Sequence, residues 1–373
     1  TASGNQSALN GGMVYTVVPL TIQNSNFFAN QVTGDGNGGA VWVSGNFTVS
    51  NTSFNANVVT SNAGTGYGGA IFFRSTAPEV IGSITDTSFA DNNAGNETGV
   101  QVAGGAVYMK LNAAINDAPY VVTFNRVLFE ANRISANVGS GPDMARGGAV
   151  AVDVSWVYFS NVTFNANVAH NTNGTNGQAV GGALWVGGAA YVDACRFIDN
   201  RVSQDNGTGV GAGGAIYHDG AVDDSTSVTV NRSWFQGNAA QAGGGYFQER
   251  SARSVIANSI FYGNTAVSAA NGGTAINNNG GASYLYHNTI VYNDGTNGVM
   301  LGQNATTYIT GNIIYNNDLY DLGFDGTGTY NIEDSMIGAA DAAANVFGTM
   351  YVLGALDVGF TSTVNGTDWT TLP

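Results

Sequence analysis

Two adjacent aspartates, Asp223 and Asp224 in the segment HDGAVDDSTS, are the residues of this 373-residue chain best suited to acid–base chemistry. Hydrolysis of a glycosidic bond needs two carboxyl groups about 5 to 9.5 Å apart across a cleft. His218 and Asp219 are close by in the sequence. A polar turn between two strands explains this segment equally well. Asp223, Asp224 and His218 are therefore candidate catalytic residues, with a structural interpretation beside the chemical one.

Arginine is the other residue that could act on a polysaccharide. An elimination reaction on an acidic glycan would use arginine or lysine beside bound calcium. Nine arginines are scattered along the chain, at positions 74, 126, 133, 146, 196, 201, 232, 250 and 253. Arg126, Arg196 and Arg232 occupy similar outward places, and Asp193 and Asp199 flank this row. The pattern favours surface ion pairs, which contribute little to stability.

The sequence gives little support for a metal site or for a catalytic nucleophile. The only lysine, Lys110, and the histidines His170, His218 and His287 make no metal-like cluster in the sequence. The single cysteine, Cys195, is expected to be a buried core residue. The segment FDGTGTYNIED is rich in calcium-compatible oxygen ligands but matches no defined calcium loop. We therefore expect no cofactor, with calcium as the alternative.

Asn-x-Ser/Thr sequons occur ten times in the chain. Chance accounts for most of them, because asparagine, serine and threonine are abundant. Four lie in glycine-rich or polar loops where a glycan would fit, at Asn96, Asn173, Asn206 and Asn365. These four are the candidate glycosylation sites.

All of these residues are set between two short motifs that alternate along the chain. The first is Phe-x-x-Asn, with Phe at 27, 54, 89, 129, 164, 197, 235 and 261, and with Ile at 290 and 314. The second is Gly-Gly-Ala, at 38–40, 68–70, 104–106, 147–149, 181–183 and 213–215, with variants at 243–245, 272–274 and 280–282. Successive Phe residues are 26 to 40 positions apart. A period of this size with variable insertions indicates a solenoid.

The element between the motifs is a β-strand. Segments such as FTVSNTSF alternate apolar or small residues with polar ones, as expected for a strand with one buried face. The residue two positions before each motif aromatic is small or medium in every copy, and this column includes Thr52, Val162 and Cys195. Stacked repeats would align that column beside a ladder of Phe in the interior.

Both motifs have a structural interpretation. The Gly-Gly pair permits a sharp bend into the next strand, and the following Ala turns inward where the cross-section is tight. The motif Asn suits a corner, since it tolerates the left-handed region and its amide can bond the equivalent Asn one repeat away. The sequence therefore predicts an all-β parallel β-helix of about ten or more coils, single-stranded, with variable loops.

The alternating Gly-Gly-Ala-Ile/Val and Phe-x-x-Asn motifs resemble the passenger repeats of the polymorphic outer-membrane proteins of chlamydial type. The resemblance covers about residues 24–317 and implies the parallel β-helix superfamily that includes pectate lyases. It implies a right-handed coil, in line with the general bias of parallel connections, and a surface adhesin. The chain departs from that family in lacking a C-terminal segment long enough for a translocating barrel.

Three regions are expected from the extent of the motifs. Residues 1–23 would form an N-terminal strand or cap, residues 24–317 the repeats, and residues 318–373 irregular last coils or a C-terminal cap. The ends of such a solenoid are open sheet edges, which are either covered or used for association. Capping and end-to-end polymerisation are both compatible with the sequence.

Composition narrows the class of protein. The formal charge is −15 and the pI about 4.2, so a nucleic acid would be repelled. No apolar run approaches the roughly 18 residues of a membrane-spanning helix. A single cysteine excludes intrachain disulfides. The start at Thr1 is compatible with removal of a signal peptide, and we expect a secreted, extracellular or cell-surface protein.

Loop lengths point to a binding surface. Insertions between each motif Asn and the next Gly-Gly pair are longest in the middle repeats. Segments 133–146, 168–180 and 201–212 would project together as a ridge, a place where binding function tends to reside. The expected contact is a partner protein, a host or cell-surface glycan, or a neighbouring subunit.

These observations favour a non-enzymatic β-helix, structural or adhesive, that assembles end to end or laterally into a filament or surface layer. The alternative is a β-helical polysaccharide lyase or glycoside hydrolase with a site that the motifs do not reveal. Converging carboxylates and arginines on one face would favour the enzyme.

Overall fold

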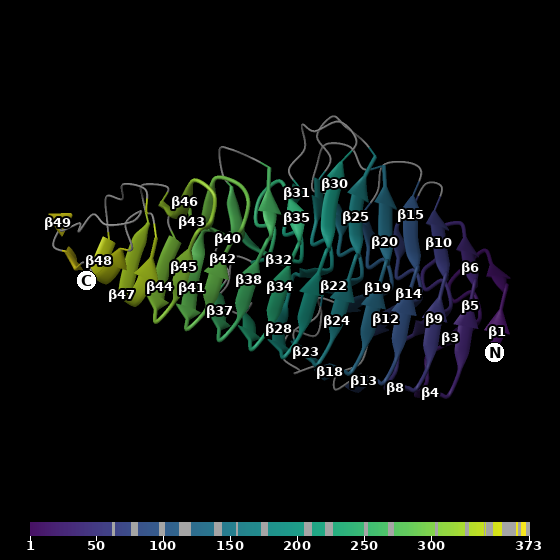
Figure 1. The fold of residues 1–373 in the computed structure, drawn as a ribbon. Coiled ribbons are helices and arrows are strands. Elements are labelled where there is room, and N and C mark those ends of the chain that lie inside the picture. The colour runs from purple at the N-terminus through teal and green to yellow at the C-terminus, as the bar shows by residue number, and fades with distance from the viewer. Residues whose placement is uncertain are drawn as a thin grey trace.

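The computed structural model describes residues 1–61, 64–75, 81–96, 101–111, 121–137, 144–153, 156–172, 178–204, 211–220, 227–249, 253–267, 272–302, 305–324, 328–338, 340, 346–352, 363–364 and 367–370. These residues form an all-β rod with the two chain termini at opposite ends (Figure 1). None of the described residues is helical. The predicted all-β class is confirmed.

Sheet A, the largest sheet, has 25 strands and receives two strands from most repeats. Its strands are β1 (Ala2–Ser3), β4 (Leu20–Gln23), β5 (Asn26–Phe28), β8 (Phe47–Ser50), β9 (Ser53–Asn55), β13 (Ile81–Thr85), β14 (Ser88–Ala90), β18 (Val121–Asn125), β19 (Leu128–Glu130), β23 (Trp156–Ser160), β24 (Thr163–Asn165), β28 (Ala189–Asp193), β29 (Arg196–Ile198), β33 (Ser227–Asn231), β34 (Trp234–Gln236), β37 (Arg253–Ala257), β38 (Ile260–Tyr262), β41 (Gly281–Tyr286), β42 (Thr289–Val291), β44 (Ala305–Thr310), β45 (Ile313–Tyr315), β47 (Thr329–Ile337), β48 (Val346–Val352), β49 (Thr363–Val364) and β50 (Thr367–Thr370).

Three smaller sheets complete the cross-section. Sheet B contains β2 (Gln6–Ser7), β6 (Gln31–Thr33), β10 (Val58–Ser61), β15 (Asn93–Asn96), β20 (Arg133–Ala136), β25 (Val168–Asn171), β30 (Arg201–Gln204), β35 (Ala239–Ala240) and β39 (Thr265–Ala266). Sheet C contains β3 (Val14–Thr16), β7 (Val41–Val43), β12 (Ile71–Ser75), β17 (Val107–Leu111), β22 (Val150–Asp153), β27 (Leu184–Val186), β32 (Ile216–Asp219), β36 (Tyr246–Glu249), β40 (Gly273–Asn279), β43 (Asn297–Leu301) and β46 (Tyr320–Phe324). Sheet D contains β11 (Gly66–Tyr67), β16 (Val102–Ala103), β21 (Met144–Arg146), β26 (Gln178–Val180) and β31 (Gly211–Ala212).

Strands pair with the equivalent strands of the neighbouring repeats. In sheet A, β9 pairs in parallel with β5 on one side and β14 on the other, so Phe54 lies beside Phe27 and Phe89. Among the described residues only β49 and β50 pair antiparallel. Residues 1–23 contribute β1 to β4, which pair with the next repeat, and sheets A and C continue beyond Asn317. This parallel-strand repeat architecture fits the predicted solenoid.

A ladder of stacked phenylalanines fills the interior, as the first motif predicts. Consecutive rings from Phe27 to Phe261 have centroids 4.3 to 5.0 Å apart and nearly parallel planes. The column two residues earlier is also inward, with Thr52, Val162 and Cys195 buried. Each buried Phe contributes about 1.5 to 3 kcal/mol through removal of apolar surface from water.

The motif asparagines form a second ladder, at the corner between sheets A and B. Asn57 donates its backbone N–H and its side-chain Nδ2 to Oδ1 of Asn92, at 3.0 and 2.9 Å. The same Nδ2 also donates to the carbonyl of Phe27 in the preceding repeat. The expected amide bonding between equivalent asparagines is confirmed, and it pairs polar groups that are fully buried.

The backbone conformation at this corner differs from the prediction. The motif Asn does not adopt the left-handed region; the residue before it does, as at Ala56 (φ 53°) and Ala166 (φ 53°). A second left-handed residue stands three positions before the motif aromatic, as at Asn51 and Asn161. The motif Asn supplies the side-chain amide that donates and accepts the hydrogen bonds of the ladder. The left-handed residue before it turns the chain so that this amide points into the ladder.

The Gly-Gly pair bends the chain into sheet C. The first glycine has a positive φ, 71° at Gly147, a region where other residues are strained. The second glycine packs against the next repeat, and a Cβ on Gly148 would lie 2.0 Å from the carbonyl oxygen of Gly182. The following Ala149 is fully buried. The predicted bend and inward alanine are both confirmed.

A layer that the motifs do not reveal lies outside this interior. Sheets B and D pack against each other through small and aliphatic residues such as Ile134 and Ala179. The other side of sheet D packs against outward aromatic residues of sheet C, among them Trp42, Tyr108 and Trp185. Sheet C is therefore buried on both faces in the middle of the rod. The predicted ridge segments 133–146, 168–180 and 201–212 supply strands of this layer, namely β20 and β21, β25 and β26, and β30 and β31. Their residues 138–143, 173–177 and 205–210 lie outside the described residues.

Candidate functional site: the outer face of sheet A

The outer face of sheet A carries a straight row of side chains, one from each repeat. Strand alternation directs these residues away from the buried Phe and Val positions. The central row runs through Thr21, Thr48, Ser83, Thr123, Tyr158, Tyr191, Thr229, Val255, Tyr284 and Tyr308 in strict register. It begins as a line of hydroxyl groups and becomes rich in tyrosine in the second half of the rod.

The tyrosines of this row are open to solvent. Tyr158, Tyr191 and Tyr308 are exposed by 38%, 36% and 37% of their surface. The rings of Tyr158 and Tyr191 are 6.1 Å apart, and those of Tyr284 and Tyr308 stack at 5.0 Å with planes 3° apart. The guanidinium of Arg253 lies 5.1 Å from the centre of the Tyr284 ring. Contacts between neighbours hold the rings in two pairs, which Thr229 and Val255 separate along the row, and we call these two pairs the aromatic strip.

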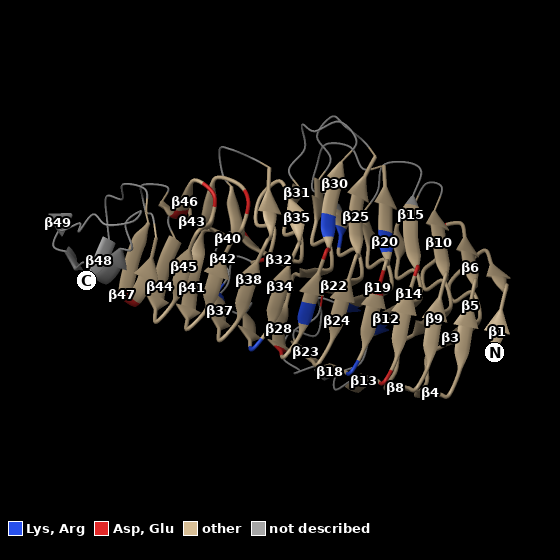
Figure 2. Cartoon of the chain, in the orientation of Figure 1, with Lys and Arg blue, Asp and Glu red and all other residues tan. Residues whose placement is uncertain are grey.

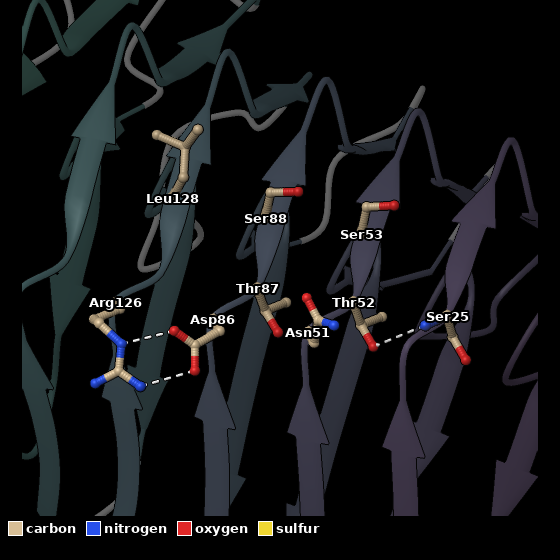
Figure 3. Close-up of a pocket in the computed structure, with 9 residues that line it drawn as sticks. All are labelled: Ser25, Asn51, Thr52, Ser53, Asp86, Thr87, Ser88, Arg126 and Leu128. Carbon is tan, nitrogen blue, oxygen red and sulfur yellow. Dashed lines mark hydrogen bonds and ion pairs between the residues drawn. The ribbon is translucent and has the colours of Figure 1, made fainter.

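A shallow groove lies on the hydroxyl-rich half of the same face (Figure 3). Its volume is about 390 Å³, and it is lined by Ser25, Asn51, Thr52, Ser53, Asp86, Thr87, Ser88, Arg126 and Leu128. The lining comes from the corner between the two strands that each repeat adds to sheet A. Hydroxyl and amide groups there could exchange hydrogen bonds with a polyhydroxylated ligand.

An ion pair closes one end of the groove. Arg126 donates from Nε and Nη2 to the two carboxylate oxygens of Asp86, at 2.6 and 2.8 Å. The hydrogen bonds from Arg126 lower the pKa of Asp86, which holds it as a carboxylate. A comparable pair joins Arg232 to Asp193 three repeats further along the rod, while Arg196 is exposed. The predicted surface ion pairs are confirmed for Arg126 and Arg232.

Charge is sparse on this side of the molecule. Figure 2 shows long uncharged stretches of sheets A and B between a few acidic and basic positions. The chain as a whole carries −15. The face therefore presents hydroxyl, amide and aromatic groups to a ligand, and long-range electrostatic attraction contributes little.

The structure places His218 in the interior. Its side chain is fully buried, Nδ1 lies 3.1 Å from the hydroxyl of Tyr246, and Nε2 has no hydrogen-bond partner. Burial lowers the pKa of His218 to about 3. Next to it along the interior, Gln248 joins Ser254 and Ser283 in a buried hydrogen-bond network. A substrate on the surface cannot reach this histidine.

Other predicted residues fall where their side chains are not described. Asp223, Asp224, Asn173, Asn206 and Asn365 lie outside the described residues, as do residues 325–327 of the calcium candidate. Asn96 ends β15, and its side chain is likewise outside them. The catalytic role of Asp223 and Asp224 therefore stays a prediction.

Cys195 lies in the core, and Lys110 lies near an aromatic ring. Cys195 is buried and its thiol contacts the carbonyl of Asp193 at 3.3 Å, and burial raises its pKa to about 12. A thiol in this state is a poor nucleophile. Lys110 lies 5.9 Å from the centre of the Tyr67 ring. Cys195 is the buried core residue that the sequence predicts.

Sequence reasoning missed a set of carboxylates at the end of sheet C. Asp153 pairs in register with Lys110, and Asp219 pairs with Glu249. Asp153 and Asp219 are separated by one strand, at Gly187. Their signal in the sequence is an acidic residue that ends the strand after Gly-Gly-Ala, in AVAVD and AIYHD. The insertions of different length between these segments hide the alignment.

The surroundings of Asp153 raise its pKa. The chief cause is burial, and the Lys110 and Arg146 cations act in the opposite direction. Tyr108 contacts the Asp153 carboxylate at 3.5 Å, and Tyr217 donates to Glu249 at 3.1 Å. A carboxyl group with a raised pKa can serve as a general acid.

Metal and membrane features are not found in the described part of the chain. No three His, Cys, Asp or Glu side chains there lie close enough to hold a metal ion. Nor does that part contain a helix able to cross a membrane. Comparison of the chain with protein-family models, curated proteins and solved structures finds no match.

Proposed function

We propose that this protein is a non-enzymatic adhesin or structural element, secreted or displayed on a cell surface, that binds an extended glycan along the outer face of sheet A. The observation that supports it is the two pairs of tyrosines on the outer face of the sheet that also carries a hydroxyl-lined groove. In this proposal the chain winds as one right-handed parallel β-helix, the hand preferred by parallel connections.

The chemistry of the face suits a sugar chain. A tyrosine offers an apolar ring to the C–H face of a sugar and a hydroxyl to its oxygen atoms, at little entropic cost. Neighbouring strands are about 4.8 Å apart, so the five steps from Tyr158 to Tyr308 span about 24 Å. That length accommodates several sugar rings. Because the rings are mounted on strands, the strip needs no rearrangement on binding.

Direct binding measurements test this function. Soluble and insoluble polysaccharides are presented to the protein, and retention is compared with that of Tyr158→Ala and Tyr284→Ala variants. We expect retention of at least one polysaccharide and its loss in both variants. Val267→Ala, at an exposed apolar residue beyond sheet B, is the matched control and should bind normally. The absence of binding to every glycan tried, or equal binding by all variants, would argue against the proposal.

A second candidate function is glycoside hydrolysis at the sheet C carboxylates. Two strand spacings place the backbones of Asp153 and Asp219 about 9.6 Å apart. The two carboxyl groups of an inverting hydrolase are roughly 6.5 to 9.5 Å apart, so side chains that lean toward each other would fit. The raised pKa of Asp153 fits a proton donor. Release of reducing ends by the wild type but not by Asp153→Asn would replace the adhesive proposal with an enzymatic one.

A further inference from the structure

Asn161 is an exposed asparagine on the outer face of sheet A, at the corner between β23 and β24. Val162 and Thr163 follow it, so it has the Asn-x-Thr sequence of an N-glycan acceptor. Its backbone is left-handed, with a φ of 54°. The corner therefore holds the acceptor amide on the surface of the folded rod, where a bulky glycan can be attached.

The side chain of Asn161 makes no hydrogen bond to another repeat among the described residues. Its Nδ2 donates to Oγ of the adjacent Ser160, at 3.1 Å. The other sequon asparagines with a described side chain do bond to a different repeat: Asn5 with Asn30, Asn46 with Ile81, Asn51 with Asn24, and Asn231 with Asp193. A glycan on Asn161 therefore disturbs no contact between repeats.

The neighbouring repeats leave space on both sides of Asn161. Ala194 stands at the equivalent corner of the following repeat, and its side chain is a single methyl group. Arg126 stands at the equivalent corner of the preceding repeat. Its guanidinium points to Asp86, one repeat further from Asn161 (Figure 3). A glycan can therefore leave this corner without displacing either neighbour.

A pair of tyrosines lies beside the acceptor on the same face. Tyr158 is three residues before Asn161, at most about 10 Å away along an extended chain. Tyr191 is its partner in the next strand, and the two exposed rings are 6.1 Å apart. A tyrosine ring offers an apolar surface to the C–H face of a sugar. The first sugars of a glycan on Asn161 therefore reach these two rings.

We propose that Asn161 is an N-glycosylation site and that the first sugars of its glycan pack on Tyr158 and Tyr191. The donor is an oligosaccharide linked to a lipid phosphate. Nδ2 of Asn161 attacks C1 of the first sugar, the C–N bond forms and the bond from C1 to the phosphate oxygen breaks. The lipid phosphate leaves, and the amide gives up one proton. The inference rests on the proposed extracellular or cell-surface location, and not on the binding of an external glycan.

Mass spectrometry of the full chain tests the site. The chain is secreted from a eukaryotic host that attaches N-glycans, and peptides that contain Asn161 are mapped. We expect a glycan on Asn161 in the wild type, its loss in Thr163→Ala, and its retention in Thr163→Ser, which keeps the acceptor sequence. Asn165→Gln, at a nearby asparagine outside any sequon, is the matched control and should keep the glycan. An unmodified Asn161 in the wild type, or a glycan that persists in Thr163→Ala, would overturn the inference.

Nitration of exposed tyrosines tests where the glycan lies. Tyr158 and Tyr191 should react more slowly in the glycosylated wild type than in Thr163→Ala, whereas Tyr284 and Tyr308 should react equally in both. Equal rates at Tyr158 and Tyr191 would overturn the packing of the sugars on these rings. Polysaccharide retention by chain made without glycans tests the proposed function separately. If that retention fails while Asn161 is glycosylated in the secreted chain, only the proposed glycan binding is lost.

Discussion

Asn167 donates two hydrogen bonds to a single atom of the next repeat, the Oδ1 of Asn200. The backbone N–H of Asn167 lies 3.0 Å from that oxygen and Nδ2 lies 2.9 Å from it. Nδ2 also donates to the carbonyl of Phe129, 3.0 Å away in the preceding repeat. One buried side chain thus links three successive repeats.

Replacement of Asn167 by alanine should therefore weaken the rod strongly. Asn132 would lose the acceptor for two donors, and both Phe129 and Asn200 would lose a donor. Each buried polar group left unpaired costs about 1 to 3 kcal/mol, so we expect a loss of about 3 kcal/mol or more in the free energy of unfolding. Urea denaturation followed by circular dichroism measures it.

Asn165→Ala is the matched control for the ladder. Asn165 is two residues earlier in the same repeat, and its amide donates to Glu130 on the outer surface. Its replacement should change the free energy of unfolding by no more than about 0.5 kcal/mol. Equal losses in the two variants would contradict the role given to the ladder.

Gly148→Ala should be among the most damaging single-methyl changes. Its Cβ would stand 2.0 Å from the Gly182 carbonyl oxygen and 2.5 Å from the Val168 carbonyl carbon, both backbone atoms that cannot move alone. We expect a loss near 3 kcal/mol, the upper end of the usual range for overpacking. Gly263→Asn is the control, because Gly263 has open space and a φ that Asn tolerates. Thermal unfolding measures the stability of both variants, and only Gly148→Ala should unfold at a clearly lower temperature than the wild type.

His218 should make the protein sensitive to mild acid. Its pKa is lowered to about 3 in the folded chain, while an unfolded histidine titrates near 6.5. Below about pH 6.5 the imidazole of His218 binds a proton in the unfolded chain, whereas in the folded chain it stays neutral until the pH approaches 3. The stability present above that pH therefore falls by up to about 1.4 kcal/mol per pH unit as the pH drops toward 3.

The comparison of two histidine variants isolates this effect. Urea denaturation between pH 7 and about pH 4.5 should show a shallower pH dependence for His218→Leu than for the wild type. His287→Gln replaces an exposed histidine and should keep the wild-type slope. Identical slopes for all three proteins would mean that His218 is accessible to protons in the folded state.

Cys195 should report on unfolding through its reactivity. Burial raises the pKa of its thiol to about 12, so the thiolate is scarce at neutral pH and the sulfur is shielded. We expect no reaction with a thiol-specific reagent in native buffer and one reactive thiol per chain in denaturant. Prompt labelling of the native protein would contradict the burial of Cys195.

The repeat architecture could be predicted from the sequence because both motifs act through identical neighbours. A Phe stacks on a Phe and an Asn bonds to an Asn only when parallel strands align the same position of every repeat. Eight copies of Phe-x-x-Asn and two of Ile-x-x-Asn are therefore sufficient to indicate stacked parallel strands. The inward place of Cys195 and the bend at Gly147 follow from the same alignment. The left-handed residue was misplaced by one position, because the sequence signal is the Asn and the conformation belongs to the residue before it.

The tertiary structure decides which side chains are exposed and which distant residues lie close together on the surface. Asp153 and Asp219 are 66 positions apart, and only the register of β22, β27 and β32 brings them within two strand spacings. Sheet D covers the aromatic residues of sheet C, so Trp185 is core, while Tyr158, equally aromatic, lies open on sheet A. Alternation along a strand tells which side chains share a face. It does not tell whether another layer covers that face, because the covering segments come from insertions that follow no common length.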